Sequence, residues 1–261
     1  AILKTEISSM GHTSDSKRGS LMINSMEHSQ GHLANTPATN WLIACHTNSR
    51  NDSSAFVIDQ QDRGLSSVSS PTGGSTLRIN TLSAQDNSDF NVHSVYVWDI
   101  GLSNTEMKVV TAGIRKELGG IPDFSTTAVV KISDLRAYYL RLLLTLKPAQ
   151  SINIFADYDV VTKTVQDRVG GVFPMTDISP TSAGHAVMIT TTGELFGNSR
   201  QLSVLEGSTA TQLLWPLKSI PSVMTMCSVS RYNKGSNARI FSGFSTSSTE
   251  QTNFLHGHYA G

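Results

Sequence analysis

Residues 95–120, VYVWDIGLSNTEMKVVTAGIRKELGG, predict a β-strand that runs into a capped helix. Ser103 and Glu106 form an S-x-x-E capping box, which satisfies two amide donors at a helix start. The glycine pair at 119–120 supplies a left-handed stop. An apolar stripe runs along the helix and consists of Met107, Val110, Ile114 and Leu118. The stretch is typical of the end of a domain, although the chain continues to residue 261.

The composition limits the classes of partner. The chain has 261 residues with 20 basic and 20 acidic side chains, which suits one large β domain or two ordinary ones. Balanced charge argues against nucleic acid or an anionic membrane as partner, and no apolar run reaches the roughly 20 residues that span a bilayer. Sparse charge with abundant Ser, Thr, Asn and Gly favours an exposed or assembled surface, in an extracellular, particle-surface or organelle-assembly setting.

Short strands separated by turn residues account for most of the chain. The strands are predicted at 20–26, 40–47, 55–59, 76–80 and 90–99, and again at 152–159, 185–190, 200–206, 223–232 and 238–244. Residues 191–194, TTGE, are predicted as a turn. Residues 121–149 form a bridging segment, with a helix predicted over 134–146 and a buried strand as the alternative.

Strict alternation in the strand 90–99 predicts which residues share a face. It places Val92, Ser94, Tyr96 and Trp98 on one face and His93, Val95, Val97 and Asp99 on the other. Both faces carry apolar side chains, so we expect a strand that is covered at least in part on both sides.

These motifs resemble the concanavalin A-like, laminin-G-like jelly-roll family. Residues 95–114 resemble its closing strand and helix, and 152–171 resemble its opening. Residues 209–232 and 40–48 are similar to two interior strands. The resemblance implies an all-β jelly-roll sandwich of antiparallel sheets in permuted order: the β-rich half 1–120 corresponds to the family's closing part, and the β-rich half 150–261 to its opening part.

The permuted order leaves several arrangements open. The chain could be circularly permuted within one subunit, could exchange halves with a neighbouring subunit, or could be cut from a tandem array. The two ranges could also be two small, similar β domains. A half-sandwich alone would expose its core face, at a cost of about 25 cal/mol for each Å² left wet. We therefore expect the halves to meet.

The carboxylates do not predict an enzyme. Glycoside hydrolases of this architecture carry carboxylates at alternate positions on one strand, E-x-D-x-x-E. The nearest approach is Asp157 and Asp159, which lack a third carboxylate and are better explained as loop anchors. No motif for a nucleophilic serine, a zinc protease or a nucleotide-binding loop is present.

Two groups of residues are candidates for ligand binding. His256, His258, Tyr259 and Phe254 near the end of the chain could bind a glycan, since sugar rings stack on aromatic faces and polar side chains read their hydroxyl groups. Asp86, Asn87 and Asp89 offer hard oxygen ligands for calcium within one loop. Asx-rich loops are more often simple turns. No cofactor is expected, and calcium at this loop is the one candidate.

Cys45 and Cys227 exclude a disulfide-rich scaffold. They occur in similar strand contexts, and two buried free thiols are favoured over a disulfide.

Function is ranked from these observations. A self-associating structural subunit of a shell, fibre, coat or matrix, with copies of itself as partners, ranks first because the order of the halves demands an explanation. A glycan-binding adhesion module ranks second, and a glycoside hydrolase last.

Overall fold

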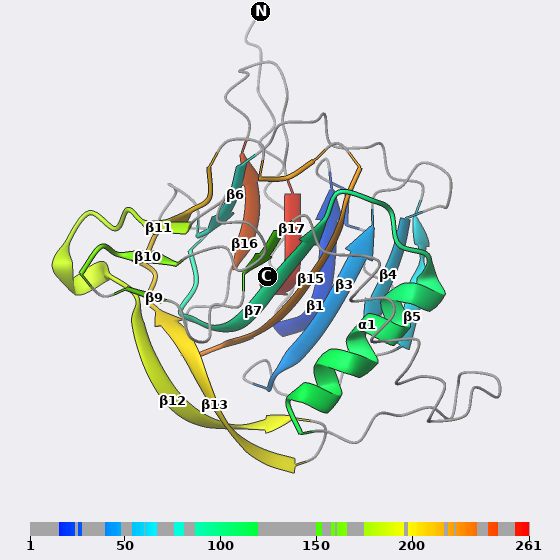
Figure 1. Ribbon diagram of the computed structural model, residues 1–261, viewed down its shortest axis with the longest axis horizontal. Helices are drawn as coiled ribbons and strands as arrows, with labels where there is room; N and C mark the ends of the chain where they lie inside the picture. The colour runs from blue at the N-terminus through cyan, green and yellow to red at the C-terminus, as the bar shows by residue number, and fades with distance from the viewer. Residues whose placement is uncertain are drawn as a thin grey trace, which may run out of the picture.

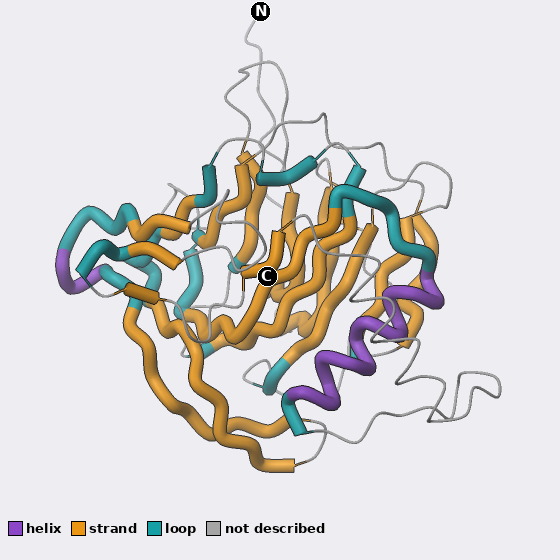
Figure 2. Tube along the Cα trace, in the orientation of Figure 1, coloured by secondary structure: helices purple, strands orange, loops and turns teal. Residues whose placement is uncertain are grey.

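The computed structural model shows two antiparallel β-sheets packed face to face, with an α-helix on the outer side of one of them (Figure 1). It describes residues 16–23, 26–27, 40–47, 54–59, 61–66, 76–80, 87–119, 150–152, 158–159, 161–165, 175–195, 198–216, 219–221, 223–233, 240–244 and 254–260. Strands make up most of this described chain (Figure 2). The predicted all-β sandwich is therefore confirmed.

Nine strands form the first sheet among the described residues. Their order is β2 (Met26–Glu27), β1 (Ser16–Ile23), β17 (Phe254–Ala260), β16 (Phe241–Phe244), β6 (Thr76–Ile79), β14 (Leu213–Leu214), β11 (Met175–Asp177), β10 (Thr164–Val165) and β9 (Tyr158–Asp159).

The second sheet is eight-stranded within the same residues. Its order is β12 (Val187–Leu195), β13 (Asn198–Gly207), β7 (Phe90–Trp98), β15 (Thr225–Tyr232), β3 (Leu42–Thr47), β4 (Ser54–Ile58) and β5 (Gln61–Ser66), and β8 (Gln150–Ile152) pairs with β7 beside β13. Strand β15 lies between β7 and β3, so a strand from the later part of the chain completes a sheet begun by the earlier part.

The main core lies between the two sheets. Side chains from the first sheet, such as Leu77 and Phe241, pack against side chains from the second, such as Phe56, Val95 and Met226, and all five are at most 2% exposed. Burial of this apolar surface is the dominant favourable contribution to folding. The sheets of the sandwich therefore stabilise each other across the whole interface.

A second core covers the outer face of the eight-stranded sheet. Helix α1 (Asn104–Glu117) lies over β3, β4 and β5 (Figure 1) and buries the predicted stripe, including Met107 and Ile114, against Trp41 and Trp98. The predicted capping box is present: Ser103 Oγ accepts a hydrogen bond from the Glu106 amide, and Glu106 Oε2 accepts one from the Ser103 amide at 2.7 Å. The helix prediction is confirmed.

A β-bulge at His93 changes the faces of β7. Val229 of β15 pairs with Ser94, but the next residue, Ser230, pairs with Val92. The extra residue reverses the alternation. Val92 consequently joins the core between the sheets, whereas Tyr96 and Trp98 face the helix. The prediction that Val92 shares a face with Ser94, Tyr96 and Trp98 was wrong for this reason.

Cys45 and Cys227 form a disulfide, so the preference for free thiols was wrong. The two residues are directly opposite on β3 and β15, with their Cα atoms 4.1 Å apart, and both are fully buried. Direct opposition in an antiparallel pair brings two Cβ atoms within the reach of a disulfide. The two cysteines are 182 residues apart in the chain, so no local pattern in the sequence predicts that they are paired.

Two further expectations changed. Residues 191–194 are not a turn but lie inside β12, which forms a nine-residue hairpin arm with β13. Strand β5 was not predicted.

The bridging segment 121–149, with its predicted helix, lies outside the described residues. In the part of the chain that the structure describes, no helix has the length and apolarity needed to cross a membrane.

Candidate functional site

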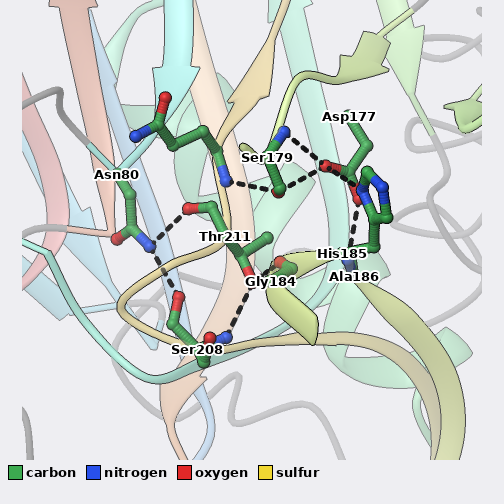
Figure 3. A network of polar contacts seen from close by, with 9 residues as sticks. Asn80, Asp177, Ser179, Gly184, His185, Ala186, Ser208 and Thr211 are labelled. Carbon is green, nitrogen blue, oxygen red and sulfur yellow. Dashed lines mark hydrogen bonds and ion pairs between the residues drawn. The ribbon is translucent and has the colours of Figure 1, made fainter. Parts of the chain in front are cut away.

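Polar side chains gather at one end of the sandwich, where several strands begin or end. Asp177 ends β11 and pairs with Leu213, which in turn pairs with Ile79 at the end of β6. The segment 178–186 and the loop 208–212 therefore meet there (Figure 3). We call the side chains that join them the rim network, which consists of Asn80, Asp177, Ser179, His185 and Thr211.

Asp177 is the acidic centre of the rim network, and its side chain is inaccessible to solvent. Oδ1 accepts hydrogen bonds from the Ser179 amide at 3.0 Å and the Ser179 hydroxyl at 2.5 Å, and His185 Nδ1 lies 3.1 Å from it. Oδ2 accepts from the Ala186 amide at 2.7 Å. Burial raises the pKa of Asp177, but these hydrogen bonds outweigh burial and hold the pKa below its ordinary value.

Asn80 holds the other side of the rim network. Its backbone is left-handed, with φ of 60°, a conformation that Asn tolerates better than most residues. Its Nδ2 donates to the carbonyl oxygens of Thr211 at 2.8 Å, Ser208 at 3.0 Å and Ser88 at 3.2 Å. Its Oδ1 accepts from the Ser88 amide at 2.9 Å. One buried side chain thus joins three segments of the chain.

The rim network does not form a serine nucleophile. Ser179 Oγ donates to Asp177 and accepts from the Gln212 amide at 3.0 Å (Figure 3). A nucleophilic serine instead donates to a histidine that an acid orients. Here the serine and the histidine both contact the carboxylate. Thr211 likewise uses its hydroxyl internally, donating to the Gly184 carbonyl at 2.6 Å. The arrangement is suited to ordering two loops.

The candidate calcium loop lies beside the rim network. Asn87 Nδ2 donates to the Thr209 carbonyl at 2.8 Å, and Asp89 Oδ1 accepts from the Thr209 amide at 3.1 Å. These two side chains therefore anchor the loop 208–212. Asp86 lies outside the described residues. Across the described part of the chain, no three His, Cys, Asp or Glu side chains gather as a metal site. Calcium binding at this loop stays a prediction.

The candidate glycan residues lie elsewhere. Phe254, His256, His258 and Tyr259 belong to β17, which lies inside the nine-stranded sheet between β1 and β16. The structure describes the backbone of this strand but not its side chains, so glycan binding there also stays a prediction.

Of the two aspartates considered for glycoside hydrolysis, the structure describes Asp159. Asp157 lies outside the described residues. Asp159 Oδ1 accepts hydrogen bonds from the amides of Val161 at 2.8 Å and Thr162 at 3.2 Å. These bonds, the one from Val161 first, hold the pKa of Asp159 below its ordinary value. The interpretation of Asp159 as a loop anchor is confirmed.

The length of the hairpin formed by β12 and β13 is a feature that sequence reasoning missed, because strands were predicted only at 185–190 and 200–206. Beyond its first residues the hairpin curls over the outer face of the eight-stranded sheet, where Leu202 and Val204 join the cluster around Trp41. Arg231 lies 4.7 Å from the Trp41 ring centroid and donates to Thr191 Oγ1 at 2.8 Å. Had residues 191–194 been predicted as strand and not as a turn, the full length of this arm would have been predicted.

The other edge of β12 is open among the described strands. β12 pairs with β13 along its full length and stands at the end of the strand order (Figure 1). Thr190 and Thr192 are exposed, and Val187 at the start of the strand is 49% exposed. An edge strand presents unpaired N–H and C=O groups, which can pair with another strand.

Comparison with known proteins adds nothing to these observations. A scan against protein-family models, a search of curated proteins and a search of solved structures each find no match to this chain.

The rim network carries a prediction for stability. We expect Asn80→Asp to lower the free energy of unfolding by about 3 kcal/mol, because a buried carboxylate oxygen would replace the donor that now faces three carbonyl oxygens. Urea unfolding of the two proteins at neutral pH measures the difference.

Asn80→Gly is the control, because glycine accepts the left-handed backbone but removes the side chain. It should be less destabilising than Asn80→Asp. An Asn80→Asp protein as stable as the wild type would show that this side chain does not join the loops as described.

Proposed function

We propose that this protein is a non-catalytic β-sandwich subunit with a structural role, which associates with copies of itself through the free edge of its eight-stranded sheet. The single observation that carries the proposal is strand β12, an edge strand of nine residues with a neighbour on one side only among the described strands. A long, uncharged edge is a template for pairing with another chain.

A comparison with the other described strands that have a free side supports this choice. The edges β2 and β9 are two residues long, and β8, which pairs only with β7, has three residues. The edge β5 has six residues and carries Asp62, which is exposed, and Arg63. Short strands and charges protect an edge from pairing. Strand β12 has neither protection over residues 187–193, VMITTTG, which hold no charged side chain.

The sandwich itself gives a different reason for association from the one first expected. Strands β3, β7 and β15 pair within one chain and bury their core faces together. Exchange of halves between subunits is therefore not needed to keep the core dry. We propose that the order of the halves is a circular permutation of a concanavalin A-like jelly roll, and that association uses the sheet edge.

The setting is part of the proposal. The buried Cys45–Cys227 disulfide supports an oxidising environment such as the extracellular space, because thiols in the cytosol are kept reduced. A matrix, coat or fibre outside the cell meets this condition.

Sedimentation velocity over an about hundredfold range of protein concentration tests the proposal, because the mass of an associating protein depends on its concentration. We expect the wild type to form oligomers and Thr192→Lys to weaken association about tenfold, since edge lysines disfavour strand pairing. Thr105→Lys, at an exposed position of α1, is the matched control and should associate like the wild type. A wild type that is monomeric at every concentration would refute the proposed function.

A further inference from the structure

We propose that the unit of association is a two-fold dimer, in which the β12 strands of two copies pair antiparallel with the symmetry axis at Thr190. This inference rests on the proposed function and adds the partner, the register and the point at which association stops. The partner is a second copy of this chain.

The distribution of charge favours this register. The uncharged segment 187–193 is centred on Thr190. When it pairs with itself antiparallel, Val187 lies opposite Gly193 of the other copy and Met188 lies opposite Thr192 of the other copy. Glu194 of each copy then lies beyond the paired segment, opposite Ala186, which precedes the strand. The register therefore brings no charged side chain into the new ladder, and no like charges oppose each other.

The faces of the strand agree with this register. Residues directly opposite in an antiparallel pair lie on the same face of the sheet. A two-fold axis perpendicular to the sheet must therefore lie between two copies of the same residue, which are directly opposite each other. Thr191 and Gly193 face Arg231 and Trp41 beneath the hairpin. Thr190 is exposed on the opposite face, beside Ser203 at 3.3 Å between hydroxyl oxygens. Thr190 can thus meet its counterpart without breaking the contacts that hold the hairpin.

The symmetry limits the assembly. A two-fold interface uses the same surface on both copies, so pairing consumes the β12 edge of each one. The other described strands with a free side are β2, β9 and β8, which have two or three residues each, β5, which carries charge, and residues 198–204 of β13, which include Arg200. We therefore expect association through strand edges to end at the dimer, and the sheet to continue across the axis from one copy into the other.

Cysteine substitution tests the register. In the native protein Cys45 and Cys227 are bonded to each other, so an added cysteine is the one free thiol. Thr190→Cys places the two new thiols opposite each other on the axis, at the separation of an antiparallel pair, about 5 Å between Cα atoms, which a disulfide can bridge. Oxidised glutathione should convert this variant to a covalent dimer, seen on a non-reducing gel.

Thr192→Cys is the matched control, because Thr192 is exposed on the same strand. In the proposed register the two copies of residue 192 are four positions apart, about 14 Å along the strand, which is too far for a disulfide. This variant should stay non-covalent. A covalent dimer of Thr192→Cys alone would overturn the register. So would a mixture of the two variants that cross-links more readily than Thr190→Cys alone.

A charge exchange tests the axis independently. Thr190→Lys and Thr190→Glu each place like charges opposite on the axis, so each variant alone should dimerise at least about tenfold more weakly than the wild type. Their mixture should recover a heterodimer, which sedimentation velocity detects as a doubling of mass. If the wild type associates but these substitutions have no effect, the β12 dimer is wrong while self-association stands. If the wild type does not associate, both proposals fail.

Discussion

Removal of the Cys45–Cys227 disulfide is expected to lower the free energy of unfolding by about 5 kcal/mol. The bond closes a chain loop with a sequence separation of 182 residues, and loss of the cross-link returns that loop's conformational entropy to the unfolded state. An ordinary domain is stable by about 5–15 kcal/mol, so this loss would leave the sandwich marginal. The double variant Cys45→Ala/Cys227→Ala, compared with the wild type by urea unfolding, measures the loss.

The reduced wild type is the control for the side chains themselves, because it keeps both sulfur atoms. Protein unfolded in reductant and then refolded with the thiols free should match the double variant. Both cysteines are fully buried, and exchange with an external thiol requires access to the sulfur. The native protein should therefore resist reduction until it unfolds. Equal midpoints for the oxidised wild type and the double variant would show that the cross-link does not stabilise the fold.

Acidification from pH 6.5 to 4.5 is expected to lower the free energy of unfolding by about 5 kcal/mol, through two histidines. Burial lowers the pKa of His46, on β3, to about 3 and that of His93, at the β7 bulge, to about 4. In the unfolded chain both histidines become protonated as the pH falls below about 6.5. For each histidine, this lowers the free energy of unfolding by about 1.4 kcal/mol per pH unit. The folded chain stays neutral in this window, so stability is complete above pH 6.5 and falls as the pH falls.

Unfolding free energies measured at several pH values in this window test the prediction. His46→Gln removes one titrating group and should halve the slope of stability against pH, whatever its effect on absolute stability. Asp177 acts in a separate window, because its pKa is lowered and its contribution is lost below the ordinary carboxyl range. A wild-type stability that stays constant between pH 6.5 and 4.5 would contradict the burial of both histidines as neutral groups.

Features encoded by neighbouring residues could be predicted. The capping box at Ser103 and Glu106, the apolar stripe of α1 and strands such as β3 and β7 depend on residues a few positions apart. Asp159 could be identified as a loop anchor because an aspartate bonds amides just beyond it in the chain.

The candidate site could be predicted only in outline. The loop with Asn87 and Asp89 was singled out for its oxygen atoms. Both side chains do lie at the rim, but Asn87 contacts Thr209 through Nδ2, and only Asp89 does so through an oxygen. The sequence analysis did not predict a role for the residues that organise that rim, which are Asn80, Asp177 and Thr211. Their partners lie up to 131 residues away in the chain, so no spacing in the sequence points to them.

Local chemistry in the sequence was thus enough to establish a β-rich chain and a capped helix, because backbone preference and alternation act over a few residues. Long-range pairing alone settled the disulfide between β3 and β15, the bulge at His93 and the open edge of β12. These features depend on which strands become neighbours and in which register. That choice follows from burying both faces of the central sheet at once, which no single segment can specify.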